Sequence, residues 1–190
     1  MTSINLRGCT GLTSIVIPDS VAEIGDNAFE RCTGLTSIVI PDSVTKIGDN
    51  AFEDCTGLTS IVIPDSVTEI GRRAFDGCTG LTSIVIPDSV TEIGDHGTFE
   101  RCTGLKSVVI NGKVKEIPTC AFEDCTSLET LTLPVGIKKI SKGDLGAFRG
   151  CIALKTINVP AKKTDYYKQR LPEELHGLIV ELPAEKKGKK

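Results

Sequence analysis

Cysteine is the residue in this 190-residue chain whose type and spacing first suggest chemistry. Seven of the eight cysteines recur at spacings of 23, 23, 23, 24, 23 and 26 residues, which matches neither zinc-ligand spacing nor a disulfide framework. Equivalent residues on stacked strands lie about 4.8 Å apart, which is within disulfide range, but their side chains point the same way, which opposes bonding. The spacing therefore predicts a ladder of reduced, buried thiols at Cys9, Cys32, Cys55, Cys78, Cys102, Cys125 and Cys151.

The eighth cysteine and the two histidines have no repeated partner. Cys120 takes the place of Asn27 and Asn50 in the repeat, and it is either an exposed thiol able to form intermolecular disulfides or a harmless substitution. His96 and His176 are predicted to be structural or solvated. Because the sequence contains no nucleophile–base pair, phosphate loop or zinc motif, we predict no enzyme activity and no cofactor.

An acidic row is the other candidate for chemistry, formed by Asp19, Asp42, Asp65 and Asp88. Calcium between successive turns is one interpretation, because hard cations prefer carboxylates. Neighbours about 5 Å apart repel by only about 0.8 kcal/mol in water, however, so no bound cation is required. The motif also lacks the further ligands of a calcium loop, and we predict no metal site.

These side chains are positioned by a repeat of 23 residues. The segment 32–54 reads CTGLTSIVIPDSVTKIGDNAFED, and it recurs with few changes at 55–77 and, with one extra residue, at 78–101. Self-similarity at this period indicates a solenoid, in which each coil contacts only its neighbours. Because a solenoid offers an extended surface rather than one deep cleft, the default function is binding.

The first half of each coil is predicted to be a strand. Ile38 and Ile40 share one face and Ser37 and Val39 the other, because strand side chains alternate. Pro41 cannot donate to a ladder and ends the strand. Such strands are expected in seven coils, marked by Leu12, Leu35, Leu58, Leu81, Leu105, Leu128 and Leu154.

The second half of each coil returns the chain to the core. Val44 and Ile47 point inward, Gly48 is expected to adopt a positive φ at the next bend, and Ala51 and Phe52 close the coil. Stacking then aligns equivalent side chains in rows, with the phenylalanines in one file. Two longer units place extra residues around His96-Gly97 and at 143–145, which we expect in loops.

We divide the chain into an array of about seven coils at 1–160, the first one partial, a cap at 161–184 and a disordered basic tail at 185–190. Thr164 is expected to cap a helix that runs through Arg170, and residues 178–180 resemble a closing strand. Tyr166 and Tyr167 are the expected packing residues of this cap.

The N-terminal end is different. Residues 1–6 imitate the LTSIVI of later units, which suggests that the numbering starts inside a longer array. We expect an open strand edge there that favours self-association.

Charge is distributed unevenly along the chain. Residues 1–100 hold five Lys and Arg against fifteen Asp and Glu, a net charge of −10, whereas residues 101–190 hold seventeen against ten, a net charge of +7. One interpretation is that this charge dipole tunes solubility. The other is that it steers copies of the chain toward one another head to tail, or draws an anionic partner to the C-terminal half. Nucleic acid is not an expected partner, because the basic residues are not interleaved with aromatics. No signal peptide opens the chain, and no apolar run is long enough to span a membrane.

The units resemble the BspA-like, treponemal type of bacterial leucine-rich repeat. The pattern C-x-x-L-x-x-I-x-I-P-x-x-V-x-x-I-G-x-x-A-F carries the resemblance from Cys9 to about Phe148, and VPAKKTDYYKQ is similar to the family's closing segment. Serine stands where the commoner pattern has Asn or Cys, which favours short strands or irregular turns on the convex side over helices. The resemblance implies a right-handed leucine-rich repeat solenoid with one long parallel sheet on its concave face. It also implies an extracellular or bacterial cell-surface protein that binds host matrix or bacterial proteins.

The outer face of the predicted strands is the strongest candidate site. Valines form an apolar stripe lined by serines, and the set comprises Ser14, Val16, Ser37, Val39, Ser60, Val62, Ser83, Val85, Ser107 and Val109. A contiguous apolar patch on an outer face is typical of an interaction site. The alternative is that valine simply favours strands and was copied with the repeat.

Two functions remain open at this point. The first is a non-enzymatic binding module, a surface or secreted adhesin that holds a protein ligand on the strand face. The second is a structural module that self-associates through the ends of the solenoid.

Overall fold

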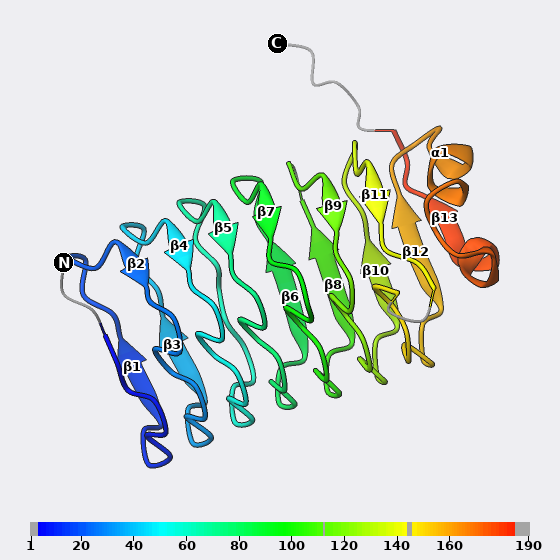
Figure 1. Cartoon of the computed structure of the whole chain (residues 1–190). Coiled ribbons are helices and arrows are strands. Elements are labelled where there is room, and N and C mark those ends of the chain that lie inside the picture. The colour runs from blue at the N-terminus through cyan, green and yellow to red at the C-terminus, as the bar shows by residue number, and fades with distance from the viewer. Residues whose placement is uncertain (1–3, 112, 144–145, 185–190) are drawn as a thin grey trace, which may run out of the picture.

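The chain winds into one row of stacked coils, with the N-terminus at one end and the only helical segments of the described part at the other (Figure 1). The computed structural model describes residues 4–111, 113–143 and 146–184. The initial segment that imitates later units, the insertion at 143–145 and the predicted tail at 185–190 lie partly or wholly outside the described residues.

Each coil carries up to two strands. The main strands are β1 (Ser14–Val16), β3 (Ser37–Val39), β6 (Ser83–Ile86), β8 (Ser107–Ile110), β10 (Thr130–Thr132) and β12 (Thr156–Val159). The shorter second strands are β2 (Glu23–Ile24), β4 (Lys46–Ile47), β5 (Glu69–Ile70), β7 (Glu92–Ile93), β9 (Glu116–Ile117) and β11 (Lys139–Ile140). All pairings are parallel, and equivalent repeat positions face each other, as Ile15 faces Ile38. The predicted parallel solenoid, with short strands opposite the main sheet, is confirmed.

The core is a set of rows that run along the solenoid. Phenylalanine rings stack from Phe29 to Phe148, with centroids 5.2 to 5.8 Å apart and planes within 9° of parallel. Inward isoleucines and leucines form parallel rows beside them. Because every coil buries its apolar side chains against the coils on either side, stacking stabilises what one coil alone would expose.

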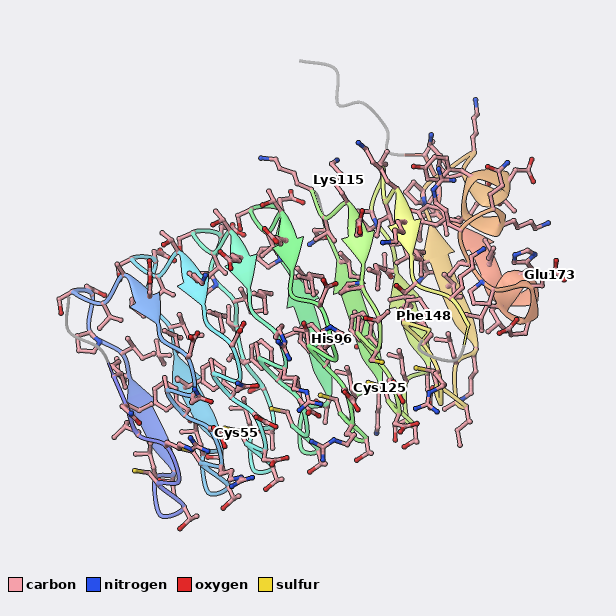
Figure 2. The ribbon with its side chains drawn as sticks, in the orientation of Figure 1. Cys55, His96, Lys115, Cys125, Phe148 and Glu173 are labelled. Atoms are coloured by element: carbon pink, nitrogen blue, oxygen red, sulfur yellow. The ribbon has the colours of Figure 1, made fainter. Side chains whose placement is uncertain are left out.

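The cysteines also form a row, and each is a free thiol. Figure 2 shows Cys55 and Cys125 on the same side of the coils. The Sγ of Cys55 donates to the carbonyl oxygen of Phe29 at 3.0 Å, and the same bond links Cys125 to Phe99 at 3.1 Å. Burial is the main cause that raises the pKa of Cys55 to about 12. The predicted thiol ladder is confirmed in position, with Cys9 and Cys151 half-buried at its ends.

Serine, which stands where the commoner repeat has Asn or Cys, bonds to the preceding coil at two positions, whereas the buried Oγ of Ser89 has no hydrogen-bond partner within the described residues. The Oγ of Ser43 donates to the carbonyl oxygen of Val21 at 2.7 Å, and that of Ser66 to Val44 at 2.6 Å. A short hydroxyl therefore satisfies the backbone of the preceding coil, and the tight turn passes directly into the second strand.

The predicted role of Gly48 at the bend is wrong. The positive φ lies two residues later, at Asn50 with φ 52° and at Asn27 with φ 58° in the preceding coil. Asparagine enters this left-handed region more readily than most residues. Gly48 is needed for space instead, because a Cβ there would lie 2.5 Å from Oδ1 and 2.7 Å from the backbone nitrogen of Asp26.

Both rows of strands are interrupted, at different coils. The main sheet divides into β1–β3 and β6–β8–β10–β12–β13, because residues 60–63 form no strand. The second row divides into β2–β4–β5–β7 and β9–β11. The break after β7 coincides with the extra residue at His96-Gly97, where both residues have positive φ and form the predicted loop.

The elements after β12 pack on the last coil (Figure 1). They are α1 (Thr164–Lys168), the 3₁₀ helix Glu173–Leu178 and β13 (Ile179–Glu181), which pairs with β12 as the predicted closing strand does. Tyr167 is fully buried and Tyr166 half-buried, which confirms them as packing residues.

The predicted helix cap is wrong, because Lys163 is the N-cap residue and α1 ends at Lys168 rather than Arg170. The Oγ1 of Thr164 instead donates to Oε1 of Glu181 at 2.7 Å, which ties the helix to β13.

Candidate functional site

The valine stripe lies on the outer face of the main sheet. The side chains of Val16, Val39, Val62 and Val85 are 70%, 58%, 78% and 51% exposed, whereas Val109 is half-buried. The alternation of side chains along a strand explains why the valines are exposed, since the isoleucines on either side of each exposed valine point into the core. The serines follow the same trend, with Ser14, Ser37, Ser60 and Ser83 exposed and Ser107 half-buried. The structure therefore brings the predicted residues of the first four coils together on one face, with the fifth coil at its margin.

Polar side chains that border the stripe bond to the coils themselves. The Oγ1 of Thr36 donates to the carbonyl oxygen of Thr13 at 3.0 Å, and that of Thr59 to Thr36 at 3.4 Å. In later coils the same position holds charges, with Nζ of Lys155 3.2 Å from Oε2 of Glu129. The border thus changes from neutral to charged along the solenoid, while the apolar stripe is confined to its first part.

Two hollows adjoin the main sheet where its strands end. The first has a volume of about 580 Å³ and is lined by Ser60, Ile61, Val62, Ile63, Asp65, Ser83, Val85, Pro87, Asp88 and Asn111. The second has a volume of about 740 Å³, shares Asp88 and Asn111 with the first, and continues past Val135 to Leu182. Sequence reasoning missed these hollows. Their signal would have been Asn111, which replaces the proline that follows each of the four earlier strands.

The predicted acidic row is exposed and borders the first hollow. Asp19, Asp42, Asp65 and Asp88 are exposed, and within the described residues none of them makes an ion pair or side-chain hydrogen bond. Among the residues that the structure describes, no group of three or more His, Cys, Asp and Glu side chains is arranged to hold a metal ion. The row therefore acts as a source of negative potential at the edge of the strand face.

A second row of carboxylates lies on another edge of the coils, and the sequence interpretation did not single it out. It consists of Glu30, Glu53, Asp76, Glu100 and Glu123, with Arg7 and Arg149 at the equivalent positions on either side. Arg7 and Arg101 pair with Glu30 and Asp76 at 2.8 and 2.9 Å, and Arg149 pairs with Glu123. Burial, followed by the nearby Asp76, raises the pKa values of Glu53 and Glu100. The ion pairs of Glu30, Asp76 and Glu123 link neighbouring coils, whereas Glu53 and Glu100 are half-buried and make no ion pair within the described residues.

The unrepeated residues do not assemble into a reactive site. Cys120 is half-buried at a bend with φ 56°, and burial raises its pKa. The Nε2 of His176 lies 3.2 Å from the carbonyl oxygen of Leu171, and His96 lies in the inserted loop. Among the described residues, no helix is long and apolar enough to cross a bilayer.

The parallel coils, the inward rows and the short second strands define a leucine-rich repeat solenoid. The chain belongs to the family described as the BspA type leucine rich repeat region, whose pattern matches residues 5–97 and 92–171.

Solved structures of leucine-rich repeat proteins are similar to the chain. The leucine rich repeat protein of T. pallidum (TpLRR) is 35% identical, with a TM-score of 0.71 over 85% of this chain and 79% of that one. The pneumococcal vaccine antigen PcpA is 21% identical, with a TM-score of 0.70 over 91% of this chain and 41% of that one, and this likeness concerns the fold. No curated protein sequence matches the chain.

Proposed function

We propose that the chain is a non-enzymatic protein-binding module of a bacterial surface or secreted adhesin. Its ligand is a host matrix protein or a protein of another bacterial surface, held on the outer face of the main sheet. The observation that carries this proposal is the stripe of four valines, each at least half exposed, on consecutive coils. Soluble proteins rarely expose a contiguous apolar patch of this kind unless it binds something.

Two further observations support binding on this face rather than elsewhere. The serines and valines named from the sequence share it, so a ligand meets alternating apolar and hydroxyl groups from each coil. The family resemblance supports the surface location and the class of ligand, because BspA-like proteins resemble adhesins. The proposed ligand-binding residues are Ser14, Val16, Ser37, Val39, Ser60, Val62, Ser83, Val85, Ser107 and Val109.

The test compares two triple variants that add the same charge. Val39→Lys, Val62→Lys and Val85→Lys place lysines on the strand face, and Thr45→Lys, Thr68→Lys and Thr91→Lys place them on exposed positions of the same three coils along the second strands. The control is structurally tolerable, because Lys115 and Lys138 occupy that position in later coils. Capture from matrix extract and from solubilised bacterial surface protein should be lost in the valine variant alone. Capture that survives in a folded valine variant would reject the proposal.

Self-association is a second candidate, favoured by the charge asymmetry between the two halves of the chain. Oppositely charged halves attract between copies, and salt screens this attraction. Light scattering that shows oligomers at low salt, dissociating as salt is added, would support this candidate. A monomer at every concentration and salt level would reject it.

A further inference from the structure

The main sheet opens at one coil although the sequence there is unchanged. The ten residues LTSIVIPDSV occur identically at 12–21, 35–44, 58–67 and 81–90, yet residues 60–63 form no strand. The backbone nitrogen of Thr59 lies 3.4 Å from the carbonyl oxygen of Thr36, and that of Thr82 lies 3.4 Å from Thr59. The equivalent distances on either side of this coil are 2.9 Å, from Thr36 to Thr13, and 2.8 Å, from Lys106 to Thr82.

The opening is confined to the strand face. On the other side of the same coil, β5 pairs with both β4 and β7. Inside it, the rings of Phe52 and Phe75 stack with centroids 5.3 Å apart. Ile61 and Ile63 also stay buried. The third coil therefore remains in the stack, and only its outer strand segment is released from the ladder.

The first hollow forms at this opening. Ser60, Ile61, Val62 and Ile63 line it, and among the described residues these four make no backbone hydrogen bond to the neighbouring strands. Val62 is the most exposed valine of the stripe. The hollow is thus lined by apolar side chains where the strand ladder is interrupted, and such a surface suits the apolar part of a ligand.

The charges around the hollow indicate the chemistry of a partner. Asp65 and Asp88 line it, and the acidic row continues away from it through Asp42 and Asp19. In the part of the chain that the structure describes, these carboxylates lack a basic partner. The potential at this end of the groove is therefore negative, and it favours lysine or arginine in a ligand.

The opposite end of the groove is apolar. Past Asp88 and Asn111, the second hollow is lined by Val135 and Leu182, which are 61% and 37% exposed, and by Pro134 and Pro183. The groove runs from the third to the seventh coil. With about 4.8 Å between successive strands, its length is about 20 Å, which corresponds to about six residues of an extended peptide.

We propose that this groove binds an extended peptide segment of a protein ligand, lying across the strands, with lysine or arginine at Asp65 and Asp88 and apolar side chains at Val135 and Leu182. This inference rests on the proposed function and specifies its ligand. It selects basic–apolar segments and rejects acidic ones, because a carboxylate in the first hollow would meet two unneutralised aspartates.

The experiment uses two fluorescein-labelled peptides, KKSVVLSG and EESVVLSG, and fluorescence anisotropy at about 50 mM salt. The first peptide should bind and the second should not. Asp65→Asn with Asp88→Asn should weaken binding of the first peptide at least ~5-fold, because two ion pairs are lost. Both side chains are exposed, so a circular dichroism spectrum and melting temperature equal to those of the wild type are expected.

The matched control is Glu23→Gln with Glu92→Gln, which removes the same charge from exposed positions outside the groove. This control should leave the affinity unchanged. Equal affinity for the two peptides, or an equal loss in the control, would overturn the inference and indicate apolar or diffuse charge attraction.

Failure of the groove inference is separable from failure of the proposed function. If Asp65→Asn with Asp88→Asn has no effect while the valine variant still abolishes capture of the protein ligand, the strand face binds by another route. If the aspartate variant weakens peptide binding but the valine variant captures its protein ligand normally, the groove binds basic peptides, but neither the groove nor the strand face holds that protein ligand.

Discussion

The thiol of Cys78 donates a hydrogen bond to the carbonyl oxygen of Phe52, with 3.1 Å between sulfur and oxygen. The two residues are 26 residues apart in the chain, and both are fully buried. The same carbonyl also accepts from the backbone nitrogen of Cys55, at 3.1 Å. One carbonyl therefore accepts both the backbone N–H of Cys55, which begins the next unit, and the thiol of Cys78, which stacks on Cys55 one turn further along. This explains why cysteine suits this position better than an aliphatic residue of similar size.

Thiol reactivity should follow this arrangement. In the native protein, a disulfide reagent at pH 8 should modify Cys120 first, because it lies at a half-exposed bend outside the ladder, and Cys120→Ser should remove that first phase. The buried thiols should react only on unfolding, since burial raises pKa values such as that of Cys55 to about 12 and keeps thiolate scarce.

The absorbance of the released reagent counts the thiols. All eight cysteines should react in denaturant without reductant. A large shortfall would reveal disulfides and contradict the ladder of free thiols. Rapid modification of more than the three half-buried residues, Cys9, Cys120 and Cys151, would contradict the burial.

Glycine at the second-strand bend should be required for space in the second, third and fourth coils, at Gly48, Gly71 and Gly94. A Cβ at Gly71 would lie 2.6 Å from Oδ1 and 2.7 Å from the backbone nitrogen of Asp49. Gly71→Ala should therefore lower the free energy of unfolding by about 1–3 kcal/mol, as overpacking does. Gly25 occupies the same repeat position, and among the residues that the structure describes no atom lies within 4 Å of such a Cβ. Gly25→Ala should be neutral or stabilising by up to about 1 kcal/mol.

Urea unfolding measures both substitutions, with the midpoint compared at an unchanged slope. Equal destabilisation by Gly71→Ala and Gly25→Ala would point to backbone conformation, not to the approach of the preceding coil.

These residues show how far the sequence determines the structure. The stacking, the phenylalanine file and the exposed valines follow from periodicity, because a residue repeated every coil must meet its own copies. The repeat pattern places Gly48 at the right bend for the wrong reason. A missing Cβ permits both positive φ and close approach, and only the position of the neighbouring coil separates the two. Local sequence favours Thr164 as a helix cap, because threonine is a good capping residue. In the folded chain Glu181 lies beside it and accepts the hydrogen bond from its hydroxyl.

The hollow at the third coil could not be predicted from the sequence of that coil. Residues 58–67 are identical to 35–44 and 81–90, so no local preference distinguishes them. Because the local sequence is the same, the difference must come from the places of these coils in the stack. A periodic sequence therefore predicts the structure of the average coil well, but it predicts poorly where a single coil differs from that average.

The buried carboxylate row should make stability depend on pH. The folded pKa of Glu53 is raised, first by burial and then by Asp76, so ionisation is less favourable in the folded state than in the unfolded state. The stability that Glu53 contributes is therefore lost as pH rises from below its unfolded pKa through its folded pKa. Glu53→Gln should stabilise the protein at pH 7 by a few tenths of a kcal/mol, because the group is partly solvated, and have no such effect at pH 3.

Glu181 supplies a control of opposite sign. The hydroxyl hydrogen bond from Thr164 is the first cause of its lowered pKa, so its contribution is present above its unfolded pKa and is lost as pH falls through the folded one. Glu181→Gln should destabilise at pH 7 and less so at pH 3. Melting temperatures at the two pH values measure both variants, and shifts of the same sign at pH 7 would refute the assignment.

Tyr167 should fix the C-terminal elements to the array. Its ring is fully buried, and its hydroxyl donates to the carbonyl oxygen of Pro134. Within the described residues this carbonyl accepts no backbone hydrogen bond. Tyr167→Phe should therefore cost about 1–3 kcal/mol, because a buried acceptor loses its donor. Tyr166→Phe should cost less, since that ring is half-buried and water can replace its 2.9 Å bond to Ile137.

Hydrogen exchange locates the effect. In a solenoid each coil contacts only its neighbours, so Tyr167→Phe should speed amide exchange in β12 and β13 and leave β1 and β3 unchanged. Faster exchange throughout the chain would show that the coils unfold as one unit and that the terminal elements stabilise the whole array. Unchanged exchange in β13 would mean that its pairing with β12, rather than the tyrosine, holds it in place.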